Sequence, residues 1–304
     1  MAFPCHVLTG QASRLAGAAT CGKRFRMRPH SRAVPSRAVM KQVEGATDRL
    51  LISLDFRAYR KDLERMARKS FGDPSAVDFV ELAEGLRHVP TFLRRMRVDG
   101  RQYASAVASA YSSLWREALG RHEENYARNC ASAEQEIESD RELASVMEWW
   151  SLESPFSREN MGRMVVMMSR LLSSYELRAR YLAGLTCIAS GHVYEVRWLV
   201  RRSTHQVENM LRLSSKDSWR GLVLGEEYIR VRKAISGRRF KFLPERRAIA
   251  FSQGHAPRPS HWHRTCSYAE FAAMVVHAAM WECGWLLGRA LEKVELGLLL
   301  RTSV

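Results

Sequence analysis

A strongly basic segment between Tyr228 and Arg247 has residue types that suit binding of a polyanion. It carries a single acid, Glu245. Its basic residues are Arg230, Arg232, Lys233, Arg238, Arg239, Lys241, Arg246 and Arg247, and two aromatic residues, Phe240 and Phe242, lie among them. Arginine binds phosphate through a planar fork of donors, and exposed aromatic rings stack on unpaired bases. The segment therefore predicts a surface for RNA or another polyanion. The alternative is a solvated sheet edge whose charges only prevent strand pairing.

A second group has the side chains that bind transition metals. The group consists of His255, His261, His263 and Cys266. A structural zinc ion takes four nitrogen or sulfur ligands in a tetrahedron, but the spacing H-x5-H-x-H-x2-C fits no familiar zinc module. We therefore expect no cofactor, and zinc held by this loop is the alternative.

Catalytic motifs give little support for an enzyme. The chain has no HExxH, no GxSxG and no GxGxxG that follows a strand. We expect a non-catalytic protein, and a helical enzyme with an unrecognised site stays as a further alternative.

The first 43 residues differ from the remainder in charge. They hold eight basic residues and no acid. Arginine-rich and acid-free composition is typical of a mitochondrial transit peptide, and the alternative is a disordered basic arm that stays on the protein. Residues 44–304 then form a helical domain, with a candidate sub-boundary near 151–156.

Apolar spacing places the elements that carry these groups. Helical periodicity covers 48–71, 101–120, the residues from Ser154 through a methionine-rich stripe, 204–213, and 267–300. Ser267 and Glu270 form a capping box at the start of the last helix. Alternation over 227–235 and 238–243, with a turn at Ser236-Gly237 and a third strand at 247–252, predicts a basic hairpin. Residues 253–266 are read as a loop. The predicted fold is mainly α, an irregular helical bundle with a small basic β-hairpin insertion near 227–252.

The last helix is apolar nearly all round between Phe271 and Leu287. It also contains His277 and Glu282, and a charge in hydrocarbon is costly. We expect core or partner packing here, with protein subunits of a larger complex on 267–300, and not integral membrane insertion.

Composition sets the class of protein. The 304 residues have a net charge of +16, and 40 of the 48 basic residues are arginine. The six cysteines show no disulfide spacing, which suits a reducing or matrix-like compartment. The sequence favours a structural, RNA-contacting subunit of a mitochondrial ribonucleoprotein such as the mitochondrial ribosome, in the matrix. The alternative is an accessory subunit of a respiratory or ATP-synthase complex.

Overall fold

The computed structural model describes residues 37–72, 88–134, 141–152, 154–192, 202–214, 219–253 and 262–301, within a compact unit that spans Ala33–Val304. The helices are α1 (Arg37–Ser53), α2 (Phe56–Phe71), α4 (Val89–Arg95), α5 (Val98–Arg121), α6 (Glu123–Glu134), α7 (Arg141–Trp150), α8 (Arg158–Ala189), α10 (Thr204–Ser214), α11 (Glu226–Ser236) and α12 (Tyr268–Arg301). The strands are β1 (Phe240–Leu243), β2 (Ala248–Gln253) and β3 (Trp262–Ser267). The prediction of a mainly α fold with a small β insertion is confirmed.

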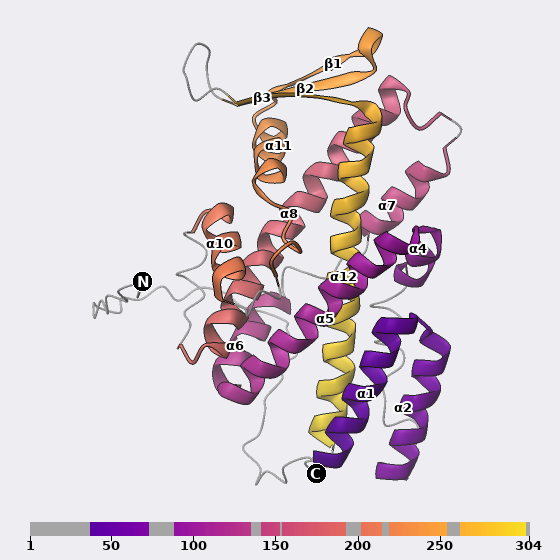
Figure 1. Cartoon of the computed structure of the whole chain (residues 1–304), viewed down its shortest axis with the longest axis vertical. Coiled ribbons are helices and arrows are strands. Elements are labelled where there is room, and N and C mark those ends of the chain that lie inside the picture. The colour runs from indigo at the N-terminus through magenta and orange to yellow at the C-terminus, as the bar shows by residue number, and fades with distance from the viewer. Residues whose placement is uncertain are drawn as a thin grey trace, which may run out of the picture. The chain divides into compact units, whose positions relative to one another are not determined.

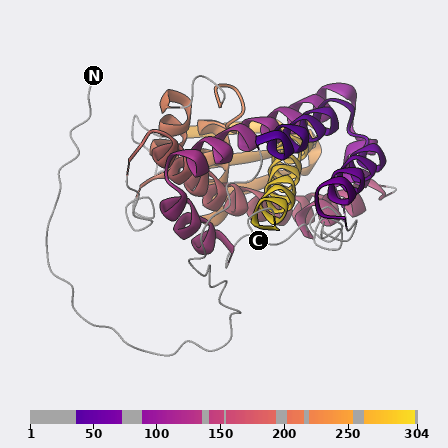
Figure 2. The same cartoon turned by 90° about the horizontal axis from the view of Figure 1, so that it is seen from below.

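Helix α12 is the central element of this unit. It runs past α5, α8, α7 and α1, and Figure 2, seen from its C-terminal end, shows helices on several sides of it. Between Tyr268 and Gly297 only Ala269, Glu270 and Ala273 are exposed. A helix that is apolar all round is expected in a core, where every face meets other side chains.

Two glycines let α5 and α12 approach closely. A Cβ added to Gly284 would lie 2.7 Å from the Cβ of Val107, and one added to Gly288 would lie 2.7 Å from the Cδ1 of Tyr111. Real Cβ atoms essentially never come so near. The crossing therefore depends on the absence of a side chain at these two positions, which are one turn apart on α12.

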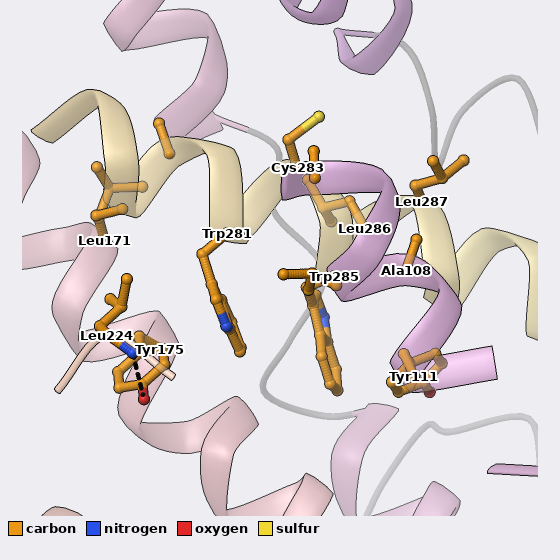
Figure 3. Packing of buried hydrophobic residues seen from close by; sticks show 14 of the residues in the cluster. Ala108, Tyr111, Leu171, Tyr175, Leu224, Trp281, Cys283, Trp285, Leu286 and Leu287 are labelled. Carbon is orange, nitrogen blue, oxygen red and sulfur yellow. Dashed lines mark hydrogen bonds between the residues drawn. The ribbon is translucent and has the colours of Figure 1, made fainter. Parts of the chain in front are cut away.

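Aromatic residues of α12 fill the space between α5 and α8. Trp281 and Trp285 project to the same side of the helix in Figure 3, with their ring centroids 6.1 Å apart. Tyr175 of α8 meets Trp281 edge-on at 4.7 Å, and Tyr111 of α5 meets Trp285 edge-on at 4.8 Å. Edge-to-face contacts of this kind contribute about 0.5–1.5 kcal/mol each beyond area burial. They connect the three longest helices of the core.

The start of α12 is capped as the sequence predicts. The backbone N–H of Glu270 donates to the Ser267 hydroxyl at 3.1 Å, and the backbone N–H of Ser267 donates to the Glu270 carboxylate at 2.6 Å. The methionine stripe of α8 is core, since Met161, Met164 and Met168 are fully buried. Ser157, rather than Ser154, caps that helix, because its hydroxyl accepts from Asn160.

The helix predicted over 48–71 is two helices. α1 begins earlier, at Arg37, so it crosses the expected leader boundary at residue 43, and Val43 is buried. The chain then breaks at Leu54, whose φ is 53°. Asp55 starts α2 by accepting the backbone N–H groups of Arg57 and Ala58 at 3.0 Å.

The predicted first strand of the hairpin is wrong. Residues 226–236 form α11, which starts after Gly225 and ends at Gly237. Val231, Ala234 and Ile235 are buried at helical spacing. The strands come later, as an antiparallel sheet of order β1-β2-β3. The strands at 240–243 and 248–253 match the predicted strands at 238–243 and 247–252, and β3 occupies part of 253–266, which the sequence predicts to be a loop.

The sheet lies across the ends of α11 and α12 (Figure 1). Its inner face carries Ile249, Phe251 and Cys266, all buried. The Gln253 side chain donates to the carbonyl of Arg230 at 2.6 Å, and Arg264 forms an ion pair with Glu227. These contacts fix the sheet to α11.

Within the described residues, Tyr268–Gly297 is a stretch long and apolar enough to cross a membrane, judged by length and composition. Of its most apolar window, 72% is buried inside this chain. A core helix has the same properties, and the buried acids described below fit that reading.

Candidate nucleic-acid interface

The ten residues predicted to bind nucleic acid lie on two elements. Arg230, Arg232 and Lys233 belong to α11, and the other seven belong to β1 or to the turns on either side of it. These ten residues also differ in whether they have partners within the fold and in how exposed their side chains are.

Two arginines of α11 are already paired. The Arg230 Nε donates to the Glu226 carboxylate one turn earlier at 3.0 Å. Arg232 is partly buried and forms an ion pair with Glu176 of α8, and burial lowers its pKa. The Arg232 pair joins α11 to α8, whereas the Arg230 pair lies within α11. Lys233 remains exposed on the last turn.

The two phenylalanines of β1 face the core. Their ring centroids are 5.7 Å apart, and Phe240 lies 6.4 Å from Phe251. Phe251 in turn contacts Phe271 of α12 at 5.5 Å. Phe240 and Phe242 therefore extend the hydrophobic core under the sheet, and neither is placed on an open surface for base stacking.

Five exposed cations remain around β1 and are called the basic rim below. They are Arg238, Arg239, Lys241, Arg246 and Arg247. In the part of the chain that the structure describes, no carboxylate forms an ion pair with any of them. The rim begins before a strand of four residues and ends after it, a length of about 13 Å at 3.3 Å per residue. A row of cations of this length, without a carboxylate partner among the described residues, is suited to a chain of phosphates.

Two rim arginines occupy a backbone conformation that favours glycine. The φ angles are 53° for Arg238 and 45° for Arg247, and among described non-glycine residues only Leu54 shares a positive φ. Arg238 occupies the left-handed position of a Schellman motif: its N–H donates to Ile235 and that of Arg239 donates to Ala234. For an L-residue this conformation costs roughly 1–2 kcal/mol.

The predicted metal group is only partly within the described residues. His255 and His261 lie outside them. His263 and Cys266 are both on β3, three residues apart, so strand alternation turns their side chains to opposite faces. His263 is exposed and Cys266 is buried, where burial raises the pKa of its thiol to about 11. No group of three or more metal-binding side chains occurs among the described residues.

Three acids along α12, at 282, 292 and 295, are buried, and their pairing was not predicted from the sequence. Glu282 forms an ion pair with Arg178 of α8, and both are at most 2% exposed. Glu292 and Glu295 lie further along the same helix, about one and two turns after Arg289. Each of these two acids is held by an arginine and by hydroxyl donors.

The last two acids have named partners. Glu292 accepts from Tyr111 and Tyr126 and pairs with Arg289. Glu295 accepts from Thr47 at 2.8 Å and from Arg116 at 2.6 Å. Burial raises the pKa of Glu295 even beside that guanidinium. Acids in an apolar helix, visible in the sequence at 282, 292 and 295, were the available signal. Their pairing indicates that they join helices and do not form an acid–base site.

A third polar cluster joins α11 to α12. The Tyr228 hydroxyl lies 2.7 Å from the Nδ1 of His277, and Tyr103 lies against the same imidazole with ring centroids 4.6 Å apart. Burial lowers the pKa of His277 and raises that of Tyr228 to about 12. The imidazole is therefore held neutral inside the bundle.

Comparison with protein-family models, with curated proteins and with solved structures finds no match.

Proposed function

We propose that this protein is a non-catalytic RNA-binding subunit of a ribonucleoprotein, and that the basic rim contacts RNA phosphates. The acid-free leader favours a mitochondrial assembly such as the mitochondrial ribosome. In such an assembly the rim would neutralise phosphates, while the helical unit serves as a rigid support for it.

The backbone of Arg238 and Arg247 is the observation that carries this proposal. Each arginine takes a left-handed conformation that glycine would adopt at lower cost. Strain of this kind clusters at functional sites, and an observed outlier is a reason to look for function. Together with the absence of carboxylate partners for the described rim, the strain supports a role for these charges beyond folding.

The alternative of an accessory subunit in a respiratory complex has less support. It would use α12 as a docking helix, but this chain's own helices cover most of that surface. Protein partners on 267–300 stay a prediction, and among residues 268–297, whose burial the structure describes, the exposed ones lie in the first turns of α12.

The test is equilibrium binding of labelled RNA to the full chain over a series of salt concentrations. The rim variant combines Arg238→Glu, Arg239→Glu and Lys241→Glu. Loss of three phosphate contacts should lower the slope of log K against log salt by about 2 to 3. Affinity at low salt should fall steeply.

The matched control makes the same three charge reversals at exposed positions of α2, with Arg57→Glu, Lys61→Glu and Arg68→Glu. Helix α2 lies at the opposite end of the unit from the sheet (Figure 1). We expect the control to keep most of the affinity. Equal loss in both variants would mean that only net charge matters, and unchanged binding in the rim variant would refute the proposal.

Cellular context needs a separate measurement. Native purification followed by identification of bound RNA and proteins should recover mitochondrial ribonucleoprotein components. Recovery of respiratory-complex subunits without RNA would instead support the alternative.

A further inference from the structure

Most residues on the outer face of the sheet are small or polar, and the larger apolar residue there is Leu243, beside the buried Ala248. The strand register aligns Lys241 with Ala250 and Thr265, and aligns Ser252 with His263. Strand alternation puts these five side chains on the face opposite to the core-facing phenylalanines. Lys241, His263 and Thr265 are exposed. We call these five residues the outer face.

The outer face is partly exposed within the described part of the chain, since Ala250 and Ser252 are half-buried. In Figure 1 the described helices that approach the sheet, α11 and α12, lie on its other side. Ala250 lies at the centre of this face, and its small methyl group leaves room for a ligand to approach the strands. Lys241 and Thr265 lie on either side of it on the neighbouring strands.

The phenylalanines of β1 do not offer this surface for base stacking. Proteins that bind unpaired strands place exposed aromatic rings where successive bases can stack. Here both aromatic residues of β1 face inward, Phe240 with its ring near Phe251 and Phe242 with its ring against Phe240. The outer face has hydroxyl, imidazole and ammonium groups instead, which suit sugars and phosphates.

From this arrangement we infer that the outer face and the basic rim bind base-paired RNA across its minor groove. The inference rests on the proposed function and specifies its substrate. An A-form duplex presents a wide, shallow minor groove lined by 2′-hydroxyls. A flat face with small residues can approach that groove, Thr265 and Ser252 can bond to 2′-hydroxyls, and the rim reaches the bordering phosphates.

An anionic membrane fits the surface less well. Peripheral membrane binding combines cations with apolar side chains that enter the headgroup layer. The large hydrophobic residues that are exposed in the described chain lie on helices and not on the sheet: they are Ile52, Val98, Val166, Leu177 and Leu213. Charge without apolar anchors favours the nucleic-acid backbone.

The experiment compares three probes against the full chain at one salt concentration. They are an RNA duplex of about 20 base pairs, longer than the roughly 16 that a double-stranded-RNA domain covers, a DNA duplex of the same sequence, and oligouridine of equal length. We expect the RNA duplex to bind about tenfold or more tightly than oligouridine, and more tightly than the DNA duplex. Equal or tighter binding of oligouridine would overturn the inference while leaving the proposed function intact.

Two substitutions test the contact surface. Ala250→Leu adds bulk at the centre of the outer face without changing charge, so duplex affinity should fall about tenfold while oligouridine affinity changes little. Phe242→Leu should change neither by more than about twofold, whereas a stacking ring would contribute about fivefold or more per base. An unaffected duplex affinity in the Ala250→Leu variant would refute the inference.

The remaining outcomes concern the proposed function itself. Absence of rim-dependent binding to every nucleic acid would refute both the proposed function and this inference. The same holds if vesicles containing phosphatidylserine bind through the rim and no RNA does. Thermal unfolding of each variant confirms that a loss of affinity is not a loss of folding.

Discussion

Replacing Arg247 by glycine should make the protein more stable and weaken its binding to RNA. The left-handed backbone at Arg247 costs an L-residue roughly 1–2 kcal/mol. Glycine removes that cost but adds about 0.5–1 kcal/mol of chain entropy in the unfolded state. The net gain is about 0.5–1 kcal/mol, which for a unit of this size raises Tm by about 1–4 °C.

The neighbouring residue provides a matched control. Arg246 is also an exposed rim cation, but it lies in the short 3-10 turn Pro244–Arg246 and has no positive φ. Arg246→Gly removes the same charge without relieving strain, so stability should fall by about 0.5–1 kcal/mol. The two variants should differ in stability by about 1–2 kcal/mol, with opposite signs relative to the parent protein.

Thermal or urea unfolding measures the stability difference, and RNA titration measures the shared loss of one cation. Each variant should reduce the salt slope of RNA binding by about 1. A loss of stability in Arg247→Gly as large as in Arg246→Gly would refute the reasoning about strain. Undiminished affinity in both variants would instead count against the rim as the RNA contact.

Three further predictions concern the core. Gly284→Ala should destabilise the fold by about 1–3 kcal/mol in urea unfolding, because the new methyl group overlaps α5. Gly162→Ala, which meets nothing within 4 Å, should instead be neutral or stabilising; equal effects would contradict the packing account. Glu282→Gln should cost up to about 3–5 kcal/mol by removing the carboxylate that forms an ion pair with buried Arg178, whereas the double change Arg178→Met with Glu282→Leu should be far milder. A double variant as unstable as the single one would argue against that explanation. Because burial lowers the pKa of His277, the unfolded chain takes up this proton first as pH falls through about 6.5, so stability should decrease toward acid pH. His277→Gln should show a smaller decrease in Tm between about pH 7.5 and 5.5, and an unchanged slope would exclude His277 as the cause.

The sequence predicts those parts of the fold that depend on residues close to one another in the chain. The capping box at Ser267 and the buried stripe of α8 are set by spacing within a single helix, so the sequence contains the necessary information. Residues 227–235 contain two patterns at once. Ile229 and Val231 alternate as in a strand, while Val231, Ala234 and Ile235 have helical spacing. The flanking Gly225 and Gly237 and the acids at 226 and 227 favoured the helix.

Information from distant residues was needed for the candidate site. Arg232 could be removed from it only once Glu176, on another helix, was known to be its partner. The inward direction of Phe240 depends on Phe251 and on α12 below the sheet. The left-handed conformation of Arg238 has no signature in residue type, because glycine lies one position earlier, at 237. The density of basic residues along the sequence therefore locates the surface, but it does not show which of these side chains already have partners within the fold.

The central position of α12 has a consequence for how the chain acquires its structure. The described helices α5 and α8 bury their aromatic and small residues against residues 271–295, which the ribosome makes after all the other elements described. Until then those surfaces have no native partner, and exposed apolar surface on a nascent chain invites aggregation. Contacts of such large sequence separation also slow folding. We expect this protein to need chaperone protection until synthesis reaches its last helix, and to fold as one cooperative unit thereafter.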